Sequence, residues 1–509
     1  MKIAIKLFFM AALALTFAAC SSNDDNEFQN PAQQPASGEI TITATIDAND
    51  GATTRTLGID GENIASTWDT NDEFAILFND GTNNVKRTAT ISSITGTTAT
   101  ITFTVSAELA DNTACTIVYP ASAANAANTG ADVATALATQ NGALATAPDV
   151  RVGTATIDKT NHNLSNVTKL AAQNAIFKFT IQNLSGADKT ATEFKVSDGS
   201  GNLITTVTLG TATGVLYVAL PEMAAGTYWF NATIGSKPYI AKATTTAATV
   251  AGTYYQTTVK MATLGDLMAD NSKFYAVVGD IPAGKQAIGV IAYLGSDATT
   301  EAIANSGGHG LVLCLKNAAS AVCWSTDMNT LEFSGQQVDG VDDLMRTTNV
   351  SGYTNTTTLA AKTDASTKYP AAYLAKNYTT LPAPATGTTG WFLPSAQQWV
   401  KMQEALGGID GSTADLTIKW NSYFDTYHTG ADKWEAALAK AGTKGTDYDS
   451  MTSTSTPLKY WSSSENSTGC AVGLTVDATG TVGNYGFCWA DHPKDNQGGQ
   501  YRVRPVLAF

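Results

Sequence analysis

Apolar and polar residues alternate with a period of two over much of the first half of the chain. In residues 39–47, Ile40, Ile42, Ala44 and Ile46 alternate with threonines, a pattern typical of a half-buried strand. Similar alternation or short apolar runs predict further strands at 74–78, 97–105, 113–119, 175–181, 203–209, 215–220, 227–234 and 254–261. Residues 121–141, rich in Ala and Asn, are either a long loop or a poor helix. The pattern therefore predicts a mainly β protein.

One stretch in the last quarter has the period of a helix instead. Ser395 can cap a helix, and Gln398 three residues later can complete a capping box. The apolar residues that follow share one helical face: Trp399, Met402 and Leu406. The last nine residues alternate again and predict a terminal strand with four side chains on one side: Tyr501, Val503, Leu507 and Phe509.

Three motifs carry a resemblance to a known family. They are the G-W-F-L-P-S-A-Q-Q-W run of residues 390–399, the Y-W-S-S-S-E run of 460–465, and the V-R-P-V-L-A-F run that ends the chain at Phe509. In this order they resemble a C-terminal module of fimbrillin-like surface lipoproteins. The resemblance implies an α+β, C-type-lectin-like module, related to sulfatase-modifying factors, over residues 264–509.

A second resemblance lies near the N-terminus. A T-R-T sequence at 54–56 is followed by Trp68, Asp72 and an apolar strand. This pattern is similar to the first of two transthyretin-like β-sandwiches in fimbrillin-like proteins. We therefore expect one sandwich at 38–163 and a second at 164–263, ahead of the C-terminal module.

Composition excludes some functions. Charged residues make up 15% of the chain and the net charge is −14. Because nucleic-acid binding needs a basic face, that function is not expected. No Lys/Arg-rich run is present, so a basic membrane-binding patch is not expected either.

The N-terminus has the features of an exported lipoprotein. An apolar run from Leu7 to Ala19 follows two lysines and is too short to span a bilayer, which predicts a signal peptide at 1–19. Its end, Phe-Ala-Ala-Cys, resembles a lipobox, so Cys20 is the expected lipidation site. Residues 20–37 are expected to form a flexible tether. The acidic residues of this tether resemble a signal that sends some lipoproteins to the outer surface. The alternative is that they are only solvated charges. The lipid would be the membrane anchor of an outer-membrane, cell-surface protein.

The other cysteines suggest two pairs. Cys470 and Cys488 flank a predicted hairpin symmetrically, and Cys314 and Cys323 flank another. In an exported protein both pairs could form disulfides. Cys115 has no such partner and is expected to be a small buried residue.

Catalysis is not expected. The four histidines are scattered, without a His-Glu-x-x-His or Cys-x-x-Cys motif, so neither a metal nor another cofactor is predicted. The serines at 462–464 are structural in the resembled module. The sulfatase-modifying relatives use a reactive Cys pair, but Cys470 and Cys488 lie in a different local sequence.

Binding has a candidate near the end of the chain. Residues 489–496 are expected to form a loop in which an aromatic lies beside acidic and amide groups. Such a mixture can stack on a sugar and hydrogen-bond to its hydroxyls. The candidate residues are Trp489, Asp491, His492, Asp495 and Asn496. The alternative is a solvated loop that only closes a hairpin.

The resemblance implies a structural or adhesive subunit of a type V fimbrium. After Lys6, the first Lys or Arg is Arg55, so a trypsin-like protease would first cut the mature chain between Arg55 and Thr56. In the resembled family, cleavage there removes the first strand with its lipid, and another subunit's C-terminal strand fills the groove.

Here the C-terminus belongs to the lectin-like module, which favours a tip position. Its partners would be other fimbrial subunits and a surface glycan or protein. The alternatives are a monomeric surface glycan-binding lipoprotein and, less favoured, an enzyme of the sulfatase-modifying kind. For Arg55 the alternative is a solvated loop residue in an uncut chain.

Overall fold

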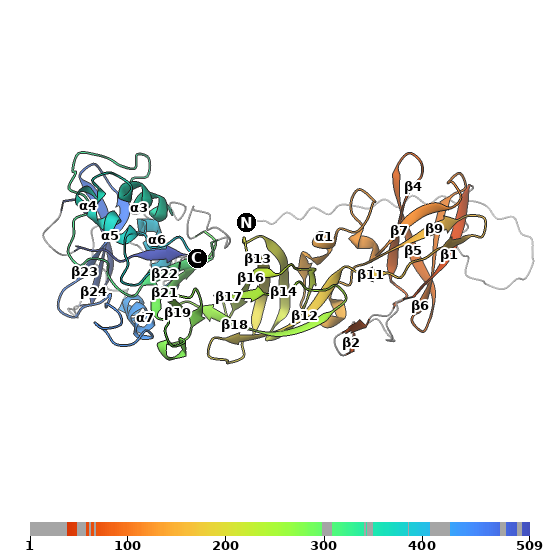
Figure 1. The fold of residues 1–509 in the computed structure, drawn as a ribbon, viewed down its shortest axis with the longest axis horizontal. Coiled ribbons are helices and arrows are strands. Elements are labelled where there is room, and N and C mark those ends of the chain that lie inside the picture. Colours follow the sequence, from red (N-terminus) through yellow and green to blue (C-terminus); the bar gives the residue numbers. More distant parts are fainter. Residues whose placement is uncertain are drawn as a thin grey trace, which may run out of the picture.

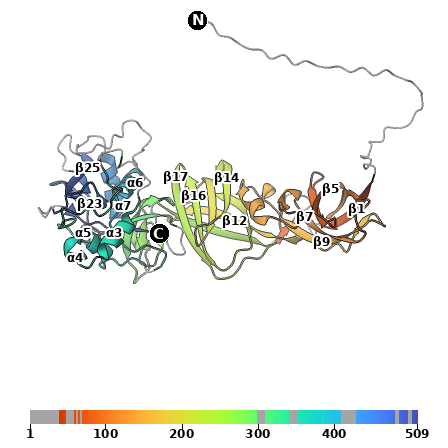
Figure 2. The ribbon, with the colours of Figure 1, turned by 90° about the horizontal axis from the view of Figure 1, so that it is seen from above.

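The protein is mainly β, as the sequence pattern predicts, and its bodies lie in a row (Figures 1 and 2). The computed structural model describes residues 38–47, 58–60, 63–65, 68–297, 308–339, 343, 350–384, 386–407, 428–478, 485–495 and 501–509. Every helix in this part of the chain is too short or too polar to cross a bilayer.

The first body is a sheet that closes on itself. Its strand order is β10-β1-β6-β5-β4-β7-β9-β11, and β10 also pairs with β9. The strands are β1 (Glu39–Asp47), β4 (Glu73–Asn79), β5 (Asn84–Thr95), β6 (Thr98–Ser106), β7 (Thr113–Tyr119), β9 (Arg151–Asp158), β10 (Asn163–Ser165) and β11 (Ala171–Ala172), beside a small hairpin of β2 (Gly58–Asp60) and β3 (Asn63–Ala65). Alternate side chains of β1, β6 and β9 point into one apolar core.

The second body is also built from antiparallel and parallel strand pairs, in the order β15-β12-β18-β17-β16-β13-β14-β8. Its strands are β8 (Thr139–Gln140), β12 (Asn174–Asn183), β13 (Ala191–Asp198), β14 (Leu203–Thr213), β15 (Val215–Pro221), β16 (Gly226–Ile234), β17 (Lys237–Thr245) and β18 (Tyr254–Thr263). Phe177, Phe179, Phe194 and Phe230 lie in its core, with neighbouring ring centroids 5.2–5.8 Å apart.

Two sequence predictions for these bodies need correction. The first sheet continues through β10 and β11 to Ala172, beyond the boundary expected at residue 164, because β9 pairs with both strands. The stretch 121–141 is neither a plain loop nor one helix. It contains a 3-10 turn η1 (Ala121–Ala123), a short helix α1 (Val133–Leu137) and β8, which crosses into the second sheet, and η2 (Leu144–Thr146) follows. Asp132 caps α1 by accepting a hydrogen bond from the Thr135 N–H at 3.0 Å.

The C-terminal module holds two sheets and most of the helices. One sheet has the order β20-β19-β21-β22-β27, and the other β25-β24-β23-β26. The strands are β19 (Leu267–Ala269), β20 (Phe274–Tyr275), β21 (Ala287–Leu294), β22 (Gly310–Cys314), β23 (Leu458–Glu465), β24 (Cys470–Ala478), β25 (Tyr485–Pro493), β26 (Tyr501–Arg502) and β27 (Val506–Ala508). The helices among the described residues of the module are η3 (Val278–Asp280), α3 (Gly352–Ala360), α4 (Ala365–Lys368), α5 (Pro370–Lys376), α6 (Ala396–Gly407) and α7 (His428–Ala439).

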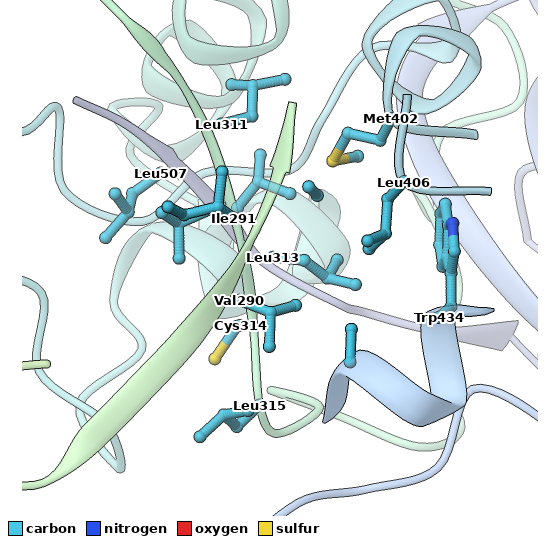
Figure 3. Close-up of a cluster of buried hydrophobic side chains, with 14 of the residues drawn as sticks. Val290, Ile291, Leu311, Leu313, Cys314, Leu315, Met402, Leu406, Trp434 and Leu507 are labelled. Atoms are coloured by element: carbon cyan, nitrogen blue, oxygen red, sulfur yellow. The ribbon is translucent and has the colours of Figure 1, made fainter. Parts of the chain in front are cut away.

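Helix α6 confirms the predicted capping box. The Gln398 N–H donates to Ser395 Oγ at 3.1 Å, and the Ser395 N–H donates to Gln398 Oε1 at 2.9 Å. The predicted apolar face is buried against β21, β22 and α7 (Figure 3). The polar face is buried too, since Gln397, Gln403 and Lys401 are each less than 5% exposed. The helix therefore lies between two layers instead of on the surface.

The predicted single strand at the C-terminus is wrong. The last nine residues form β26 in one sheet and β27 in the other, separated by Val503, Arg504 and Pro505. Pro505 has no N–H to continue a ladder, which favours the break. The Arg504 guanidinium is buried between the sheets, where its Nη1 donates to Asp449 O at 3.0 Å. The end of the chain thus joins the two sheets of the module.

Candidate functional site

The first strand is held by one long ladder and one short contact. β1 pairs antiparallel with β6 at every position from Glu39↔Ser106 to Asp47↔Thr98. Its other edge meets β10 at a single register position, where the Thr43 N–H donates to His162 O at 3.0 Å. Ile42, Ala44 and Ile46 point into the core, while the side chains between them are exposed.

Removing β1 would therefore open the first body. Burying two isoleucine side chains contributes about 3–6 kcal/mol, and the free edge of β6 would lose a full row of backbone partners. The gap left between β6 and β10 is a groove with an apolar floor and unpaired backbone groups. Such a groove suits an extended segment with apolar residues at alternate positions.

The core on which β1 packs also contains aromatic residues of the pattern found by sequence analysis. Trp68, Phe74 and Tyr119 form an aromatic cluster with ring centroids 4.9–5.2 Å apart. Asp72, which is 3% exposed, accepts a hydrogen bond from the Tyr119 hydroxyl at 3.1 Å and another from the Asp69 N–H at 2.8 Å. Asp72 thus fixes the turn before β4 to the end of β7. The W-x-x-x-D pattern builds the core beside β1.

The predicted processing residues cannot be placed. Arg55 and Thr56 lie outside the described residues, in the segment that follows β1, and the lipidation candidate Cys20 lies outside them as well.

The three motifs of the C-terminal module meet in one structural cluster. Ser464 Oγ accepts a hydrogen bond from the Ala396 N–H at 3.0 Å at the start of α6, and Ser463 N–H donates to Pro394 O at 2.8 Å. The Trp461 ring stacks on Tyr501 at 4.0 Å between centroids. The serine run therefore links β23 to α6.

A buried ion pair completes the cluster. Lys494 Nζ pairs with Glu465 Oε1, and the two side chains are 1% and 0% exposed. Glu465 Oε2 also accepts from the N–H groups of Glu332 and Phe333, both at 2.9 Å. Burial raises the pKa of the Glu465 carboxyl, and the nearby Lys494 ammonium opposes that rise. These contacts hold the 324–333 loop onto β23, so the role of the pair is structural.

The loop predicted at 489–496 is mostly a strand. Trp489, Asp491 and His492 belong to β25, opposite Leu474, Val472 and Ala471 of β24. Asp495 is exposed just beyond it, and Asn496 lies outside the described residues. Pairing with β24 therefore fixes the backbone of the three residues in β25, whereas the sequence pattern predicted a loop.

The His492 ring packs against aromatic residues of the module. Its ring centroid lies 4.8 Å from that of Tyr501. The glycine at position 473 leaves space for the tyrosine ring, since a Cβ there would lie only 2.7 Å from Tyr501 Cε1. Burial, together with the charge of Lys459, lowers the pKa of His492 to about 4. The imidazole is therefore neutral at pH 7, with aromatic neighbours on its inner side.

The predicted cysteine pairs do not form. Cys470 lies opposite Pro493 and Cys488 opposite Thr475, so the expected cross-strand pairing is wrong because the hairpin turns later than predicted. Cys314 and Cys323 are buried and unbonded, since Cys314 ends β22 and the described residues between it and Cys323 form no return strand. Burial raises the pKa of the Cys314 thiol to about 11. Cys115 is 5% exposed in the first core, as expected of a small buried residue.

Within the described part of the chain, no three His, Cys, Asp or Glu side chains gather in a way that could hold a metal ion.

Comparisons with known proteins give structural likeness only. No protein-family model and no curated protein matches the chain. A fimbrial protein from Bacteroides ovatus is 16% identical, with a TM-score of 0.33, over 93% of this chain and 99% of its own. A putative cell adhesion protein from Bacteroides uniformis is 14% identical, with a TM-score of 0.28, over 44% of this chain and 98% of its own. A fimbrial assembly protein from Parabacteroides distasonis is 12% identical, with a TM-score of 0.25, over 43% of this chain and 90% of its own. These TM-scores are low, and the function of this chain is therefore argued from its own residues.

Proposed function

We propose that this chain is an adhesive subunit of a cell-surface fimbrium, assembled by strand exchange at its first body. The supporting observation is the position of β1. It is the first described strand, it fills one strand position of a closed sheet, and the segment that follows it contains Arg55. Cleavage after Arg55 would free β1 together with the lipid on Cys20 and open the groove between β6 and β10.

The far end of the molecule supports a tip position. A subunit that donates its C-terminal strand needs that strand to be free. Here β27 is part of the module, and Val506, Leu507 and Ala508 are all 0% exposed. Because its last described strand is already built into the module, we propose that this chain accepts a strand without donating β27, as a terminal subunit would. The lectin-like module would then face outward and bind a glycan or protein.

Processing is tested by sequencing the N-terminus of the protein in sheared fimbriae. We expect the fimbrial form to begin at Thr56, and Arg55→Ala to prevent incorporation because β1 stays in place. Arg55→Lys is the matched control, since a protease that cuts after any basic residue still processes it. A fimbrial form that begins at Cys20 and assembles equally well with Arg55→Ala contradicts strand exchange at this site.

Anchoring is tested separately by Cys20→Ser, which we expect to release the protein from the membrane fraction because the lipid is the only proposed anchor. Unchanged membrane retention would rule out lipidation at this residue. Recovery of the wild-type protein only from membranes, never from sheared fimbriae, would favour the monomeric glycan-binding lipoprotein.

A further inference from the structure

The second body and the C-terminal module meet at a joint where they share one apolar core. Trp229 of β16, Ile240 of β17 and Ala262 of β18 belong to the same apolar core as β21, β22 and β27. The Trp229 ring lies 3.9 Å from the His309 ring, between centroids. Surfaces on the two sides of this joint therefore lie next to each other.

A cleft of about 880 Å³ lies beside the joint. One wall comes from β16, β17 and β18 of the second body, and the other from the β19–β20 hairpin, the residues after it, and Thr386. Pockets for ligands commonly occur between domains, where two surfaces supply converging groups.

Lysines dominate the charge of this cleft, although the chain as a whole is acidic. Lys242 and Lys260 come from the second body and Lys273 from the module, and the lining contains one carboxylate, that of Asp280. Within the described residues none of the three lysines forms an ion pair. A concave surface with one sign of charge concentrates oppositely charged ligands.

Lys242 is the most constrained of these cations. Its Nζ lies 5.0 Å from the centroid of the buried Trp229 ring. Packing around the ammonium lowers the pKa of Lys242, because desolvation disfavours its charge. An anion bound beside it would offset that cost.

The hairpin wall adds oriented polar and aromatic groups. Asn271 Nδ2 donates to the Tyr275 hydroxyl at 2.8 Å, and Asn271 Oδ1 accepts from the Lys273 N–H at 3.1 Å. The Tyr275 hydroxyl keeps its own proton available to a ligand. Phe274 lines the same wall and is held by a T-shaped contact with Phe509, 5.2 Å between centroids. Threonine hydroxyls line the opposite wall.

We propose that this cleft binds an acidic saccharide, a chain of sugars that carries carboxylates such as uronic acids. The three lysines would pair with successive carboxylates, and Tyr275, Asn271 and the threonines would bind ring hydroxyls. The cleft is much larger than an inorganic anion, and its hydroxyl and amide groups match sugar hydroxyls better than an acidic peptide. This site is distinct from the strand-acceptor groove. It deepens the proposed adhesive function by naming a ligand class.

The test is calorimetric titration of the purified, unassembled protein with tetragalacturonate, so that failure of assembly does not affect it. We expect binding that weakens as salt rises, and little binding of the neutral maltotetraose. Each of Lys242→Gln, Lys260→Gln and Lys273→Gln should weaken binding about threefold to tenfold, and the triple variant about a hundredfold. Gln keeps part of the side-chain stem over Trp229, and a thermal unfolding curve checks that the fold is intact.

Lys285→Gln is the matched control, since it removes an exposed lysine of the module outside the cleft; it should leave the affinity unchanged. Tyr275→Phe should weaken tetragalacturonate binding by about threefold while leaving salt dependence unchanged. Equal binding by the folded triple variant, or tighter binding of hexaglutamate or inorganic sulfate than of tetragalacturonate, would overturn the proposal.

Discussion

The two ends of the described chain both finish in a β-strand, but they are built into the protein differently. β1 alternates between buried and exposed side chains and lies over one core. The side chains on both faces of β27 are buried. Its two edges are paired as well, one with β22 and the other with the 389–392 segment, where the Phe392 N–H donates to Val506 O at 2.9 Å. Phe509 beyond it is 1% exposed.

The difference separates a strand that can be exchanged from one that cannot. A strand with one solvent-exposed face can leave and be replaced by another strand that alternates apolar and polar residues in the same way, because only one row of side chains must match the groove. A strand buried on both faces must match two packed surfaces and cannot leave without opening the core. Strand exchange is therefore proposed for the first body and not for the module.

The sharpest test of this comparison is deletion of residues 506–509. Loss of three large apolar side chains from a packed core should destabilise the module by about 4–9 kcal/mol, enough to prevent its folding. Deletion of residues 38–47 should leave the module folded. Near-ultraviolet circular dichroism, which reports tryptophan packing, shows for each deletion variant whether the module is folded. A synthetic peptide of residues 38–47 should restore the first body, and native-like spectra for the 506–509 deletion would contradict the distinction.

The buried ion pair offers the next largest effect. Lys494→Met should destabilise the module by about 3–5 kcal/mol, because it leaves the Glu465 carboxylate buried without its cation. Urea unfolding followed by tryptophan fluorescence gives the value. The double variant Lys494→Met/Glu465→Gln is the control and should recover part of the loss. A single variant within about 1 kcal/mol of the wild type would show that the pair does not hold the loop.

A smaller effect is expected in the first body. Tyr119→Phe should cost about 1–2 kcal/mol, because Asp72 loses a buried hydrogen bond while the ring packing is kept. Tyr217→Phe in the second body is the matched control, since the Tyr217 hydroxyl has no hydrogen bond in the described structure. Equal free energies of unfolding for the two variants would argue against a role for Asp72 in fixing β4 to β7.

The smallest effect concerns pH. The folded pKa of His492 is about 4, below its ordinary value of 6.5, so the unfolded chain binds the proton more tightly. Stability contributed by the neutral ring is therefore present above about pH 6.5 and is lost as pH falls toward 4, on the order of 1 kcal/mol because the ring is partly exposed. His492→Phe should flatten this part of the profile of unfolding free energy against pH. The exposed His162→Asn is the control and should leave the profile unchanged; an unaltered profile in His492→Phe would exclude His492 as its source.

Local patterns in the sequence predicted local structure well. The alternation in 39–47 predicts β1, and Ser395 and Gln398 predict the start of α6, because strand faces and capping boxes depend on residues close together in the chain. The pairing of Cys470 with Cys488 failed for a related reason. Symmetry about a guessed turn fixes neither the turn nor the register, and the backbone ladder set a different one.

The sequence by itself determined that the chain is mainly β, where its first strand lies, and which residues start α6. Only the tertiary structure decided that β10 closes the first sheet beside β1, that the last residues divide between two sheets, and that Lys242, Lys260 and Lys273 share a cleft. The physical reason is how far apart in the sequence the residues lie that determine each feature. Periodicity and capping are set by neighbours within a few residues, whereas sheet closure, a strand buried on both faces and a cleft between bodies depend on segments that only packing brings together.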